Sequence, residues 1–381
     1  MTHPSFPRPL AAGLAAALLC LGACRQQATN TIPIGEYASL TGSEAAFGQA
    51  THLGIQLAVE QANAAGGVLG KQLQLVTEDN GSKQGESATI AQKLISRDRA
   101  VALLGEVASS RSLEVAPICQ ADKVPMITPA STNPAVTQAG DYIFRVCFID
   151  PFQGQVLARF AKDTLKVRRV ASLIAVSSAY SVGLAKYFKE PFEAGGGAVV
   201  LEQKYSNGDK DFKAQLTAIH AANVEALFIP GYYSDVALIC IQARELGLTC
   251  PIFGGDGWEA PELVGIGGAA VEGCYYSDHF APSDPSPTAQ AFVKAFQARY
   301  QDKIPDAMAA LGYDAARLLV QAIQRAGTTD EPALRDAIAA TKDFDGVTGR
   351  TTIDAERNAS KSAVVVQVVK GQTVLVQTFP P

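Results

Sequence analysis

Short apolar runs of strand length alternate along this chain with longer segments in which apolar residues recur at helical spacing. Residues 32–40 are expected to form the first strand, and residues 49–64 a helix that stops at Gly66 and Gly67. Further strands are expected at residues 72–77, 100–104, 124–128, 170–176, 199–205, 226–229 and 252–254, with helices at 112–121, 152–165, 185–194, 212–222 and 236–246. Strands separated by helices predict right-handed βαβ units and a parallel sheet.

The same alternation restarts after Asp150 and Pro151, so the chain contains two similar α/β halves, the first ending near residue 149. A chain of 381 residues also exceeds one ordinary hydrophobic core, which favours about two domains. Strand ends from both halves are expected to face the crevice between them, where open α/β sheets bind ligands.

Two of the expected strand ends carry small hydroxyl residues. The strand at 124–128 leads into Pro-Ala-Ser-Thr-Asn-Pro at 129–134, and the strand at 100–104 leads into Gly-Glu-Val-Ala-Ser-Ser at 105–110. Loops at the carboxyl ends of parallel strands can turn hydroxyl and backbone groups toward a crevice. The two loops together predict a site for a small-molecule carboxylate.

Helical spacing resumes at Ser112, which places Ser109 and Ser110 near a helix N-terminus. Free backbone N–H groups and the positive end of the helix dipole attract an anion at such a position. The alternative is that Ser109 and Thr132 only cap a helix and a turn, as such residues usually do.

The first 24 residues have the features of a secretory signal. Arg8 supplies a basic region, residues 10–21 are apolar but too short to span a bilayer, and Leu-Gly-Ala-Cys follows at 21–24. This segment resembles lipoprotein signals, in which the cysteine, here Cys24, is lipidated and becomes the mature N-terminus. Residues 25–31 are then a polar tether. The alternative is an ordinary signal peptide in which Cys24 happens to follow small residues.

The charge of the chain indicates no polyanionic partner. The full sequence has a net charge of −5; residues 1–24 contain one basic and no acidic residue, so the remainder carries 31 basic and 37 acidic residues, or −6. Nothing in this balance suggests nucleic acid binding. No later apolar run approaches the roughly 20 residues that a membrane helix needs.

Four segments occur in an order and approximate spacing that resemble a known family. They are Gly-Gly-Val-Leu-Gly at 66–70, Gly-Glu-Val-Ala-Ser-Ser at 105–110, Met-Ile-Thr-Pro-Ala-Ser-Thr at 126–132 and Phe-Gly-Gly-Asp-Gly at 253–257. The chain resembles the leucine/isoleucine/valine-binding receptors of bacterial ABC importers from about residue 32 to 370. The resemblance implies the type I periplasmic-binding-protein fold, two doubly wound parallel-sheet lobes joined by three hinge crossings.

The resemblance also implies how the chain is divided. The first lobe is expected to comprise residues 32–149 and 280–349, including helices at 288–300, 308–326 and 332–341. The second lobe is expected to comprise residues 150–279 and 350–381, ending in the apolar strands at 363–369 and 373–379.

The family motifs imply a binding site for a free amino acid. They place the ligand carboxylate on Ser109 and Thr132, with the backbone of Ala108 and Ala130 beside them. They place the ammonium on the Ala130 carbonyl, the Thr132 hydroxyl and Asp256. This charge pattern is physically reasonable, because a zwitterion leaves water only when both charges find fixed partners.

Three aromatic residues match positions that enclose the ligand in the family: Tyr180 and Tyr232 on the second lobe and Phe47 on the first. The alternative for Tyr232 is a half-buried aromatic at a sheet end, and the alternative for Asp256 is a turn residue between glycines. Several relatives carry glutamate where Asp256 stands, so the amine is expected to sit deeper or to belong to a different amino acid.

The remaining chemistry is sparse. Beyond Cys24 the mature chain has an odd number of cysteines without a C-x-x-C spacing, so small buried residues are expected in preference to a metal site, and at least one thiol stays unpaired. These are Cys119, Cys147, Cys240, Cys250 and Cys274. His52, His220 and His279 lack partners at metal spacing and are interpreted as structural or surface residues. No cofactor, metal or catalytic residue is expected.

These observations predict a lipid-anchored, monomeric substrate-binding protein, exported to the periplasm or cell surface, that delivers an amino acid, branched-chain or related, to an inner-membrane ABC permease. The alternative is a regulatory or sensory lipoprotein of the same fold with a different ligand or a protein partner. An exported hydrolase is not supported, because no nucleophile has a base visible in the sequence.

We expect Cys24→Ala to release the protein from the membrane or to leave its precursor unprocessed. The reason is that the lipid can be attached only through the thiol of Cys24. Membrane fractionation and the intact mass of the exported protein measure both outcomes. An unchanged membrane fraction for the variant would exclude lipidation at Cys24.

Overall fold

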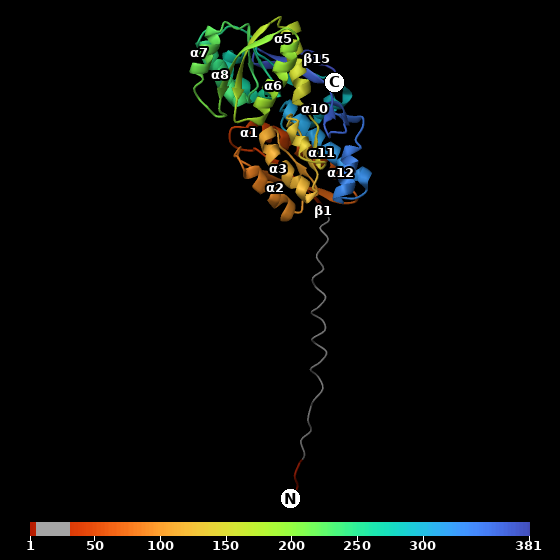
Figure 1. Cartoon of the computed structure of the whole chain (residues 1–381). Coiled ribbons are helices and arrows are strands. Elements are labelled where there is room, and N and C mark those ends of the chain that lie inside the picture. The colour runs from red at the N-terminus through yellow and green to blue at the C-terminus, as the bar shows by residue number, and fades with distance from the viewer. Residues whose placement is uncertain (5–30) are drawn as a thin grey trace.

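The computed structural model describes residues 1–4 and 31–381. The expected signal sequence from residue 5 onward, with Cys24, and the tether up to residue 30 lie outside the described residues. The remainder of the chain forms two α/β lobes (Figure 1). One lobe contains α1 to α3 together with the late helices α10 to α12, and the other contains α5 to α8 and the final strand β15 (Figure 1).

The first lobe is built on a five-stranded, fully parallel sheet in the order β2-β1-β3-β4-β5. Its strands are β1 (Thr31–Ala38), β2 (Gln72–Asp79), β3 (Leu103–Leu104), β4 (Met126–Thr128) and β5 (Ile143–Arg145). Strand β3 is shorter than the expected 100–104. Before Leu103 the chain is joined to β1 only by single hydrogen bonds, such as that from the Val101 N–H to the Pro33 carbonyl, and these do not extend the ladder.

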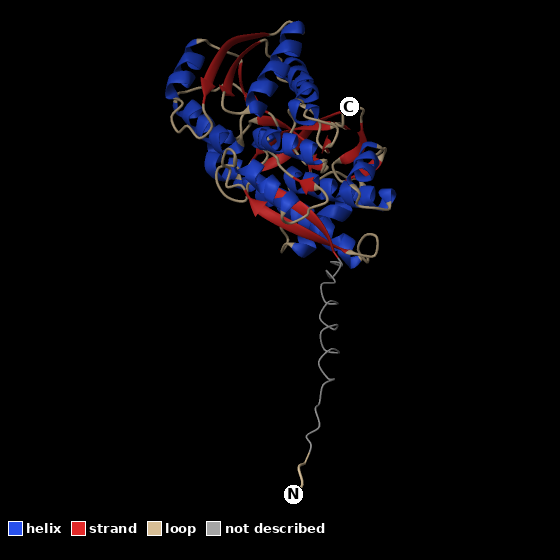
Figure 2. Ribbon diagram, turned by 60° about the horizontal axis from the view of Figure 1, so that its bottom comes forward, coloured by secondary structure: helices blue, strands red, loops and turns tan. Residues whose placement is uncertain are grey.

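Helices cover both faces of this sheet (Figure 2). They are α1 (Ala45–Ala64), α2 (Glu86–Ser96), α3 (Ser109–Asp122), α4 (Ala135–Gln138), α10 (Pro287–Arg299), α11 (Ala307–Ala326) and α12 (Glu331–Ala339). Helix α1 begins four residues before the predicted start at residue 49, and Gly48 in its first turn lies against the Ser39 backbone. Helix α11 packs along α1, which joins the C-terminal part of the chain to the first lobe.

The second lobe contains a seven-stranded sheet in the order β15-β14-β10-β9-β8-β6-β7. Its strands are β6 (Arg169–Ala175), β7 (Ala198–Tyr205), β8 (Ala226–Ile229), β9 (Ile252–Gly254), β10 (Tyr275–Asp278), β14 (Ala363–Val369) and β15 (Gln372–Phe379). Strands β6 to β10 pair in parallel, whereas β14 and β15 are antiparallel additions.

The helices of the second lobe are α5 (Asp150–Asp163), α6 (Ala179–Ala194), α7 (Lys213–Ala221), α8 (Tyr233–Glu245) and α9 (Pro261–Gly267), with the 3-10 helices η1 (Asp256–Trp258) and η2 (Gly268–Val271). Phe188 of α6 packs on Phe228 of β8 and Phe253 of β9, with ring centroids 4.3 and 5.6 Å away. Truncating a buried phenylalanine to alanine typically costs about 3–5 kcal/mol, so such contacts fix the helix on the sheet.

The chain passes between the lobes three times, at neighbouring positions. It passes first between β5 and α5, then after β10, and finally between β13 (Ala359–Ser360) and β14; β13 belongs to a small antiparallel sheet with β11 (Phe344–Gly346) and β12 (Gly349–Ile353). The Phe148 and His279 rings stack at 3.7 Å and so join the first two passages. The first and third are joined by Lys361 Nζ, which donates to the Val146 carbonyl over 3.4 Å.

The predicted architecture of two α/β lobes around parallel sheets is therefore confirmed. In the described part of the chain, no helix combines the length and apolar character required to span a membrane.

Candidate functional site

Ser109 and Thr132 follow two adjacent strands of the first lobe and lie at the same edge of its sheet. Strand β3 pairs in parallel with β4, and each strand ends a few residues before its hydroxyl residue. Ser109 is the first residue of α3, is almost fully buried, and its Oγ accepts a hydrogen bond from the Asn133 backbone N–H at 3.3 Å. This bond ties the two predicted loops together.

The Thr132 hydroxyl is buried and makes no hydrogen bond of ordinary geometry within residues 31–381. Within the same residues, no hydrogen bond to the Ala130 carbonyl is found either. The Ala108 N–H, by contrast, donates to Glu106 Oε2 at 2.9 Å. The predicted binding groups thus differ. The Thr132 hydroxyl and the Ala130 carbonyl can still form hydrogen bonds to a ligand, whereas the Ala108 N–H is already hydrogen-bonded to Glu106.

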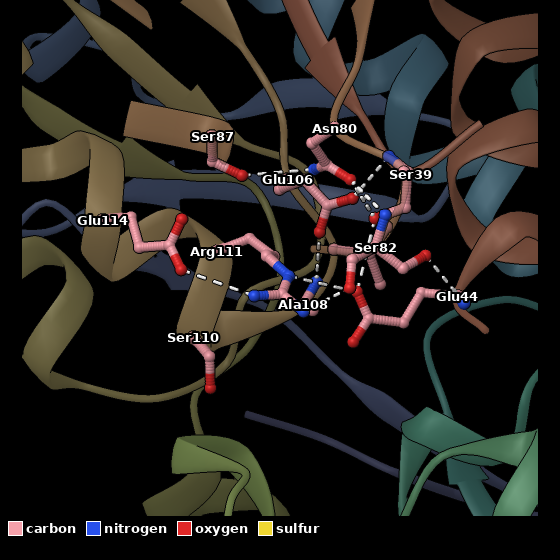
Figure 3. Close-up of polar contacts among 12 residues, drawn as sticks. Ser39, Glu44, Asn80, Ser82, Ser87, Glu106, Ala108, Ser110, Arg111 and Glu114 are labelled. Carbon is pink, nitrogen blue, oxygen red and sulfur yellow. Dashed lines mark hydrogen bonds and ion pairs between the residues drawn. The ribbon is translucent and has the colours of Figure 1, made fainter. Parts of the chain in front are cut away.

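Glu106 is a residue that the sequence interpretation missed, although it lies inside the motif at 105–110. Its carboxylate accepts the backbone N–H of Ser39 at 2.8 Å as well as that of Ala108 (Figure 3). The Ser39 hydroxyl donates in turn to Asn80 Oδ1 at 2.8 Å. Ser39, Asn80 and Glu106 follow β1, β2 and β3, so this cluster fixes three strand ends, and with them the start of α3.

Arg111 and Glu44 extend the cluster toward the second lobe (Figure 3). Arg111 contacts Glu44 and Glu114, each at 3.4 Å, and donates to the Ser82 carbonyl at 2.7 Å. Burial and the nearby Glu106 raise the pKa of Glu44 to about 7 despite Arg111, and burial also raises the pKa of Glu106. Glu44 and Glu106 together therefore carry less than two full negative charges near neutral pH.

Asp256 lies on η1 at the carboxyl end of β9 in the second lobe, with only 3% of its surface exposed. Its Oδ1 accepts from Gln153 Nε2 at 2.7 Å and from the Tyr180 hydroxyl at 2.9 Å. Its Oδ2 lies 2.9 Å from His279 Nε2. A turn residue facing solvent would have none of these contacts, so the carboxylate is held in one orientation from three sides.

The glycines on either side of Asp256 permit this arrangement. A Cβ at Gly255 would lie 2.4 Å from the Tyr180 hydroxyl, and a Cβ at Gly257 would lie 2.9 Å from both the Tyr180 and Tyr232 rings. The Gly-Asp-Gly sequence is thus explained by the close packing of Tyr180, Tyr232 and the Gly231 backbone against the two glycines.

His279 and Gln153 were not predicted to belong to the site. The interpretation of His279 as a structural residue describes its stacking on Phe148 but omits its contact with Asp256. Burial lowers the pKa of His279, so the ring is neutral near pH 7 and Nε2–H donates to the carboxylate. Neither residue lies in a recognisable motif, so only the fold brings them to Asp256.

Asp150 is a second carboxylate that the sequence interpretation used only as a boundary between the halves. It begins α5, is fully buried, and neither oxygen makes a hydrogen bond within residues 31–381. It faces the Thr132 hydroxyl and interacts electrostatically with Asp256. Burial, together with the charge of Asp256, raises the pKa of Asp150 to about 8.

Arg145 does not pair with Asp150 through a hydrogen bond. Its guanidinium group donates to the carbonyls of Ser131 and Asn133, the latter at 2.9 Å, and to Thr137 Oγ1 at 3.2 Å. Arg145 is therefore a positioning residue that holds the loop carrying Thr132.

The three predicted aromatic residues meet between the lobes. Tyr180 and Tyr232 stack with ring centroids 5.3 Å apart and an interplanar angle of 9°, and Phe47 meets the Tyr232 ring edge-on at 5.5 Å. The Tyr232 hydroxyl is buried without a hydrogen-bond partner among the described residues. The aromatic walls of both lobes are thus in direct contact.

Polar contacts also join the rims of the lobes. The Ala179 N–H donates to Ser110 Oγ at 3.1 Å, and Asn133 Nδ2 donates to the Ala179 carbonyl at 2.8 Å. The Ala46 N–H donates to the Tyr233 hydroxyl at 3.1 Å. The lobes therefore lie in a closed arrangement.

The arrangement presents hydroxyl and helix N-terminal groups on the first lobe and carboxylates at Asp150 and Asp256, with aromatic rings between them. Such a surface can satisfy an anion and a cation of the same small molecule. In the described part of the chain, no three His, Cys, Asp or Glu side chains are grouped so that they could hold a metal ion.

Comparison with known proteins gives consistent matches over most of the chain. A family model described as periplasmic binding protein matches residues 31–373. A leucine-, isoleucine-, valine-, threonine- and alanine-binding protein from Pseudomonas aeruginosa is 31% identical over 329 residues, which cover 86% of this chain and 87% of the relative.

Two solved structures have closely similar folds. The leucine-binding protein LivK from Thermotoga maritima is 42% identical, with a TM-score of 0.88 and coverage of 92% of this chain and 99% of the other. LivJ from Streptococcus pneumoniae, a branched-chain amino acid transporter substrate-binding protein in complex with isoleucine, is 34% identical, with a TM-score of 0.87 and coverage of 92% and 100%.

We expect Asp150→Asn to stabilise the ligand-free protein increasingly as the pH rises from about 4 to about 8. The pKa of Asp150 is raised to about 8 in the folded chain from an ordinary 3.8, so the folded state keeps a proton that the unfolded state releases. The wild type therefore loses stability as the pH rises through this window, whereas asparagine does not titrate. The difference grows by at most about 1.4 kcal/mol per pH unit.

Urea denaturation of both proteins at pH 5, 6.5 and 8 measures this difference. Asp163→Asn, which changes an exposed acid at the end of the same helix, is the matched control. A stability difference that does not change with pH would show that Asp150 is already ionised in the folded protein.

Proposed function

Because the chain belongs to the periplasmic binding protein family, we propose that it is the substrate-binding protein of an ABC importer and binds a free amino acid, branched-chain or related, between its lobes. The observation that carries this proposal is the pairing of hydroxyl groups on one lobe with buried carboxylates on the other. The family and fold are those of solute-binding proteins, and the relatives named above are by name binding proteins for leucine and other branched-chain amino acids, one of them also for threonine and alanine.

The ligand carboxylate is proposed to bind at the first-lobe loops. Ser109 Oγ and the N-terminus of α3 supply donors there, and the Thr132 hydroxyl makes no hydrogen bond of ordinary geometry among the described residues. Hydroxyl and N–H donors suit this role because they stabilise the anion without adding a competing positive charge. Ala108 contributes through Glu106, which fixes the backbone at the start of α3.

The ligand ammonium is proposed to bind between the Ala130 carbonyl, the Thr132 hydroxyl and Asp256, with Asp150 as a second carboxylate. Both carboxylates are almost fully buried, where an ionised group is costly without a positive partner. Asp150 faces the Thr132 hydroxyl, and burial together with the charge of Asp256 raises the pKa of Asp150 to about 8, which favours its protonated form in the absence of a cation. A bound ammonium would supply that charge.

The aliphatic part of the ligand is proposed to lie against Phe47, Tyr180 and Tyr232. These rings meet at the lobe interface, so an apolar side chain placed among them contacts both lobes. Trp258 is fully buried in the second lobe and donates Nε1–H to the Ile229 carbonyl at 2.9 Å. It therefore supports the η1 turn from behind.

We further propose that the protein acts as a lipid-anchored monomer outside the inner membrane and delivers its ligand to an ABC permease. The family supports export, and the sequence up to Cys24 supports the anchor. Closed lobes present one continuous rim, formed at contacts such as Ser110 with Ala179, which a permease could distinguish from separated lobes.

We expect branched-chain amino acids to bind the wild-type protein and the corresponding α-keto acids, which lack the ammonium, to bind far more weakly. A ligand at about 100 times its dissociation constant adds roughly 2.7 kcal/mol to folding stability, so a thermal-shift screen finds it. In calorimetry with the best ligand, Asp256→Asn should lose about 3–5 kcal/mol of binding free energy, the usual result of removing one partner of a buried charge pair.

Asp235→Asn is the matched control, because Asp235 is a buried acid of the same lobe that accepts from the Gly208 N–H. A loss below about tenfold, near 1.4 kcal/mol, for Asp256→Asn would make Asp256 a turn residue. If no amino acid shifts the melting temperature, the regulatory or sensory alternative becomes the better description.

We also expect ligand binding to close the lobes, because a ligand that contacts both lobes has greater affinity for the closed arrangement. Small-angle scattering should show a smaller radius of gyration with ligand than without it. Tyr232→Ala should weaken binding roughly tenfold, chiefly through faster release, since contacts with the second lobe form after the first lobe has captured the carboxylate.

Tyr275→Ala removes a tyrosine of the same lobe that packs on Phe160 in the interior and serves as the control for release rates. An unchanged radius of gyration together with an unchanged release rate for Tyr232→Ala would exclude closure around the ligand.

A further inference from the structure

A cavity lies where the second lobe adjoins the loop before α11 of the first lobe. Its volume is about 470 Å³, within the range of roughly 300–1,000 Å³ that small-molecule sites occupy. Its walls come from the start of α9, from β10 and the second passage between the lobes, from the loop before α11, and from β14 and β15. In the described part of the chain, the lining includes none of the residues proposed to contact the amino acid. Both lobes therefore form this cavity, and it is separate from the proposed ligand site.

Most of the cavity wall is apolar, and so is its opening. Ile304 and Leu375 are 62% and 42% exposed and so lie at the opening. An apolar group bound there would remove this surface from water, which is favourable. The apolar lining residues include Leu263 and Val264 of α9, Phe280 of the second passage, Ile304 of the loop before α11, Val366 of β14 and Leu375 of β15.

Three carboxylic acids line the same cavity: Glu259, Asp278 and Asp306. The Tyr276 hydroxyl donates to Glu259 Oε2 at 2.5 Å. Because alternate residues of a strand lie on one face, Asp278 of β10 lies on the same side of the strand as Tyr276. The Ala307 N–H donates to Glu259 Oε1 at 3.4 Å, which brings the neighbouring Asp306 of the first lobe to the same place. Acids of both lobes therefore converge on one end of the cavity.

Asp278 is a buried acid without a cationic partner of its own. It is 1% exposed, and within residues 31–381 its only hydrogen bond of ordinary geometry comes from the His279 backbone N–H to Oδ1, at 2.7 Å. Burial, together with the charge of Glu259, raises the pKa of Asp278 well above its usual range. Lys303, the one basic residue among the described lining residues, is itself exposed. A cation that enters the cavity would therefore stabilise the ionised form of this carboxylate.

The N-terminus of α11 does not offer a site for an anion here. The Ala307 N–H is hydrogen-bonded to Glu259, and the Ala309 N–H donates to Asp306 Oδ1 at 2.8 Å. Protein carboxylates thus already accept from these helix donors, and their charges repel a further anion. A zwitterion such as a free amino acid is therefore disfavoured relative to a ligand that carries only positive charge.

We propose that this cavity binds a small organic cation, in which an ammonium group is carried on an apolar body. The ammonium lies among Glu259, Asp278 and Asp306, which can accept charge-assisted hydrogen bonds, and the apolar body lies against the walls and the opening. Among the described residues, no three His, Cys, Asp or Glu side chains are grouped so that they could hold a metal ion, so an organic cation fits better than a metal. This function is additional to the proposed binding of an amino acid.

Calorimetry of the full chain with 2-phenylethylammonium tests the proposal. At pH 8, Asp306, whose pKa burial raises to about 7, is largely ionised. The probe keeps its charge at this pH, because alkylammonium groups lose their proton only near pH ~10. We expect saturable binding with one probe per chain. The uncharged 2-phenylethanol, which has nearly the same shape, should bind about tenfold more weakly, because it cannot offset the charge of the acids.

A substitution at the opening shows whether the probe occupies this cavity. Ile304→Lys adds a competing ammonium group and should weaken probe binding about tenfold, and the exposure of Ile304 makes the change compatible with folding. Ile266→Lys is the matched control, because Ile266 is 43% exposed on α9 but is not among the described lining residues. Its probe affinity should be unchanged. Asp278→Asn should also weaken binding about tenfold, and if that variant does not fold, Ile304→Lys decides.

Three results would each overturn the proposal: no saturable binding of 2-phenylethylammonium to the wild type, equal affinity for 2-phenylethanol, or unchanged affinity in Ile304→Lys. The last result is also the one expected if the amine occupied the proposed amino acid site instead. Because all of these measurements are made without an amino acid, their outcome does not depend on whether the amino acid proposal is correct.

Discussion

The buried carboxylate of Glu106 is the interaction on which the geometry of the first lobe depends. By accepting the N–H groups of Ser39 and Ala108, it joins residues that follow two different strands and sets the backbone that leads into Ser109. Two charge-assisted hydrogen bonds inside the protein are worth more than surface ion pairs, because water does not compete for them. The position of the hydroxyl groups that are proposed to face the ligand therefore follows from Glu106, which does not itself need to contact the ligand.

A second constraint is the number of acids in the cleft region. Asp150 and Asp256 are almost fully buried, and Glu44 lies close to Glu106 with Arg111 as its partner. Gln153, Tyr180 and the neutral His279 donate hydrogen bonds to Asp256, but none of them carries a positive charge. This part of the lobe interface is thus complementary to a small cation or zwitterion, and the proposed amino acid would satisfy that demand.

The sequence alone predicted the family, confirmed by comparison, and most of the elements, because strand runs and helix periodicity are local signals. It also identified the loops of Ser109 and Thr132, since hydroxyl residues at adjacent strand ends form a recognisable pattern. It missed Gln153 and His279, which are distant along the chain and reach Asp256 only after folding. Asp150 was missed for another reason: the sequence shows a helix start, while its burial is a property of the lobe interface.

The adjacent passages between the lobes have a mechanical consequence. Stacking of Phe148 on His279 and the contact of Lys361 with Val146 couple three chain segments that would otherwise twist separately. For the proposed closure of the lobes, this coupling favours one principal axis of rotation over several independent ones. Because the His279 side chain also hydrogen-bonds to Asp256, the second passage between the lobes is in direct contact with the candidate site. Substitutions at these passages can therefore change the ligand affinity through the free energy of lobe rotation. Natural variation there can alter the ligand concentration at which the lobes close, without any change in the residues that are proposed to contact the ligand.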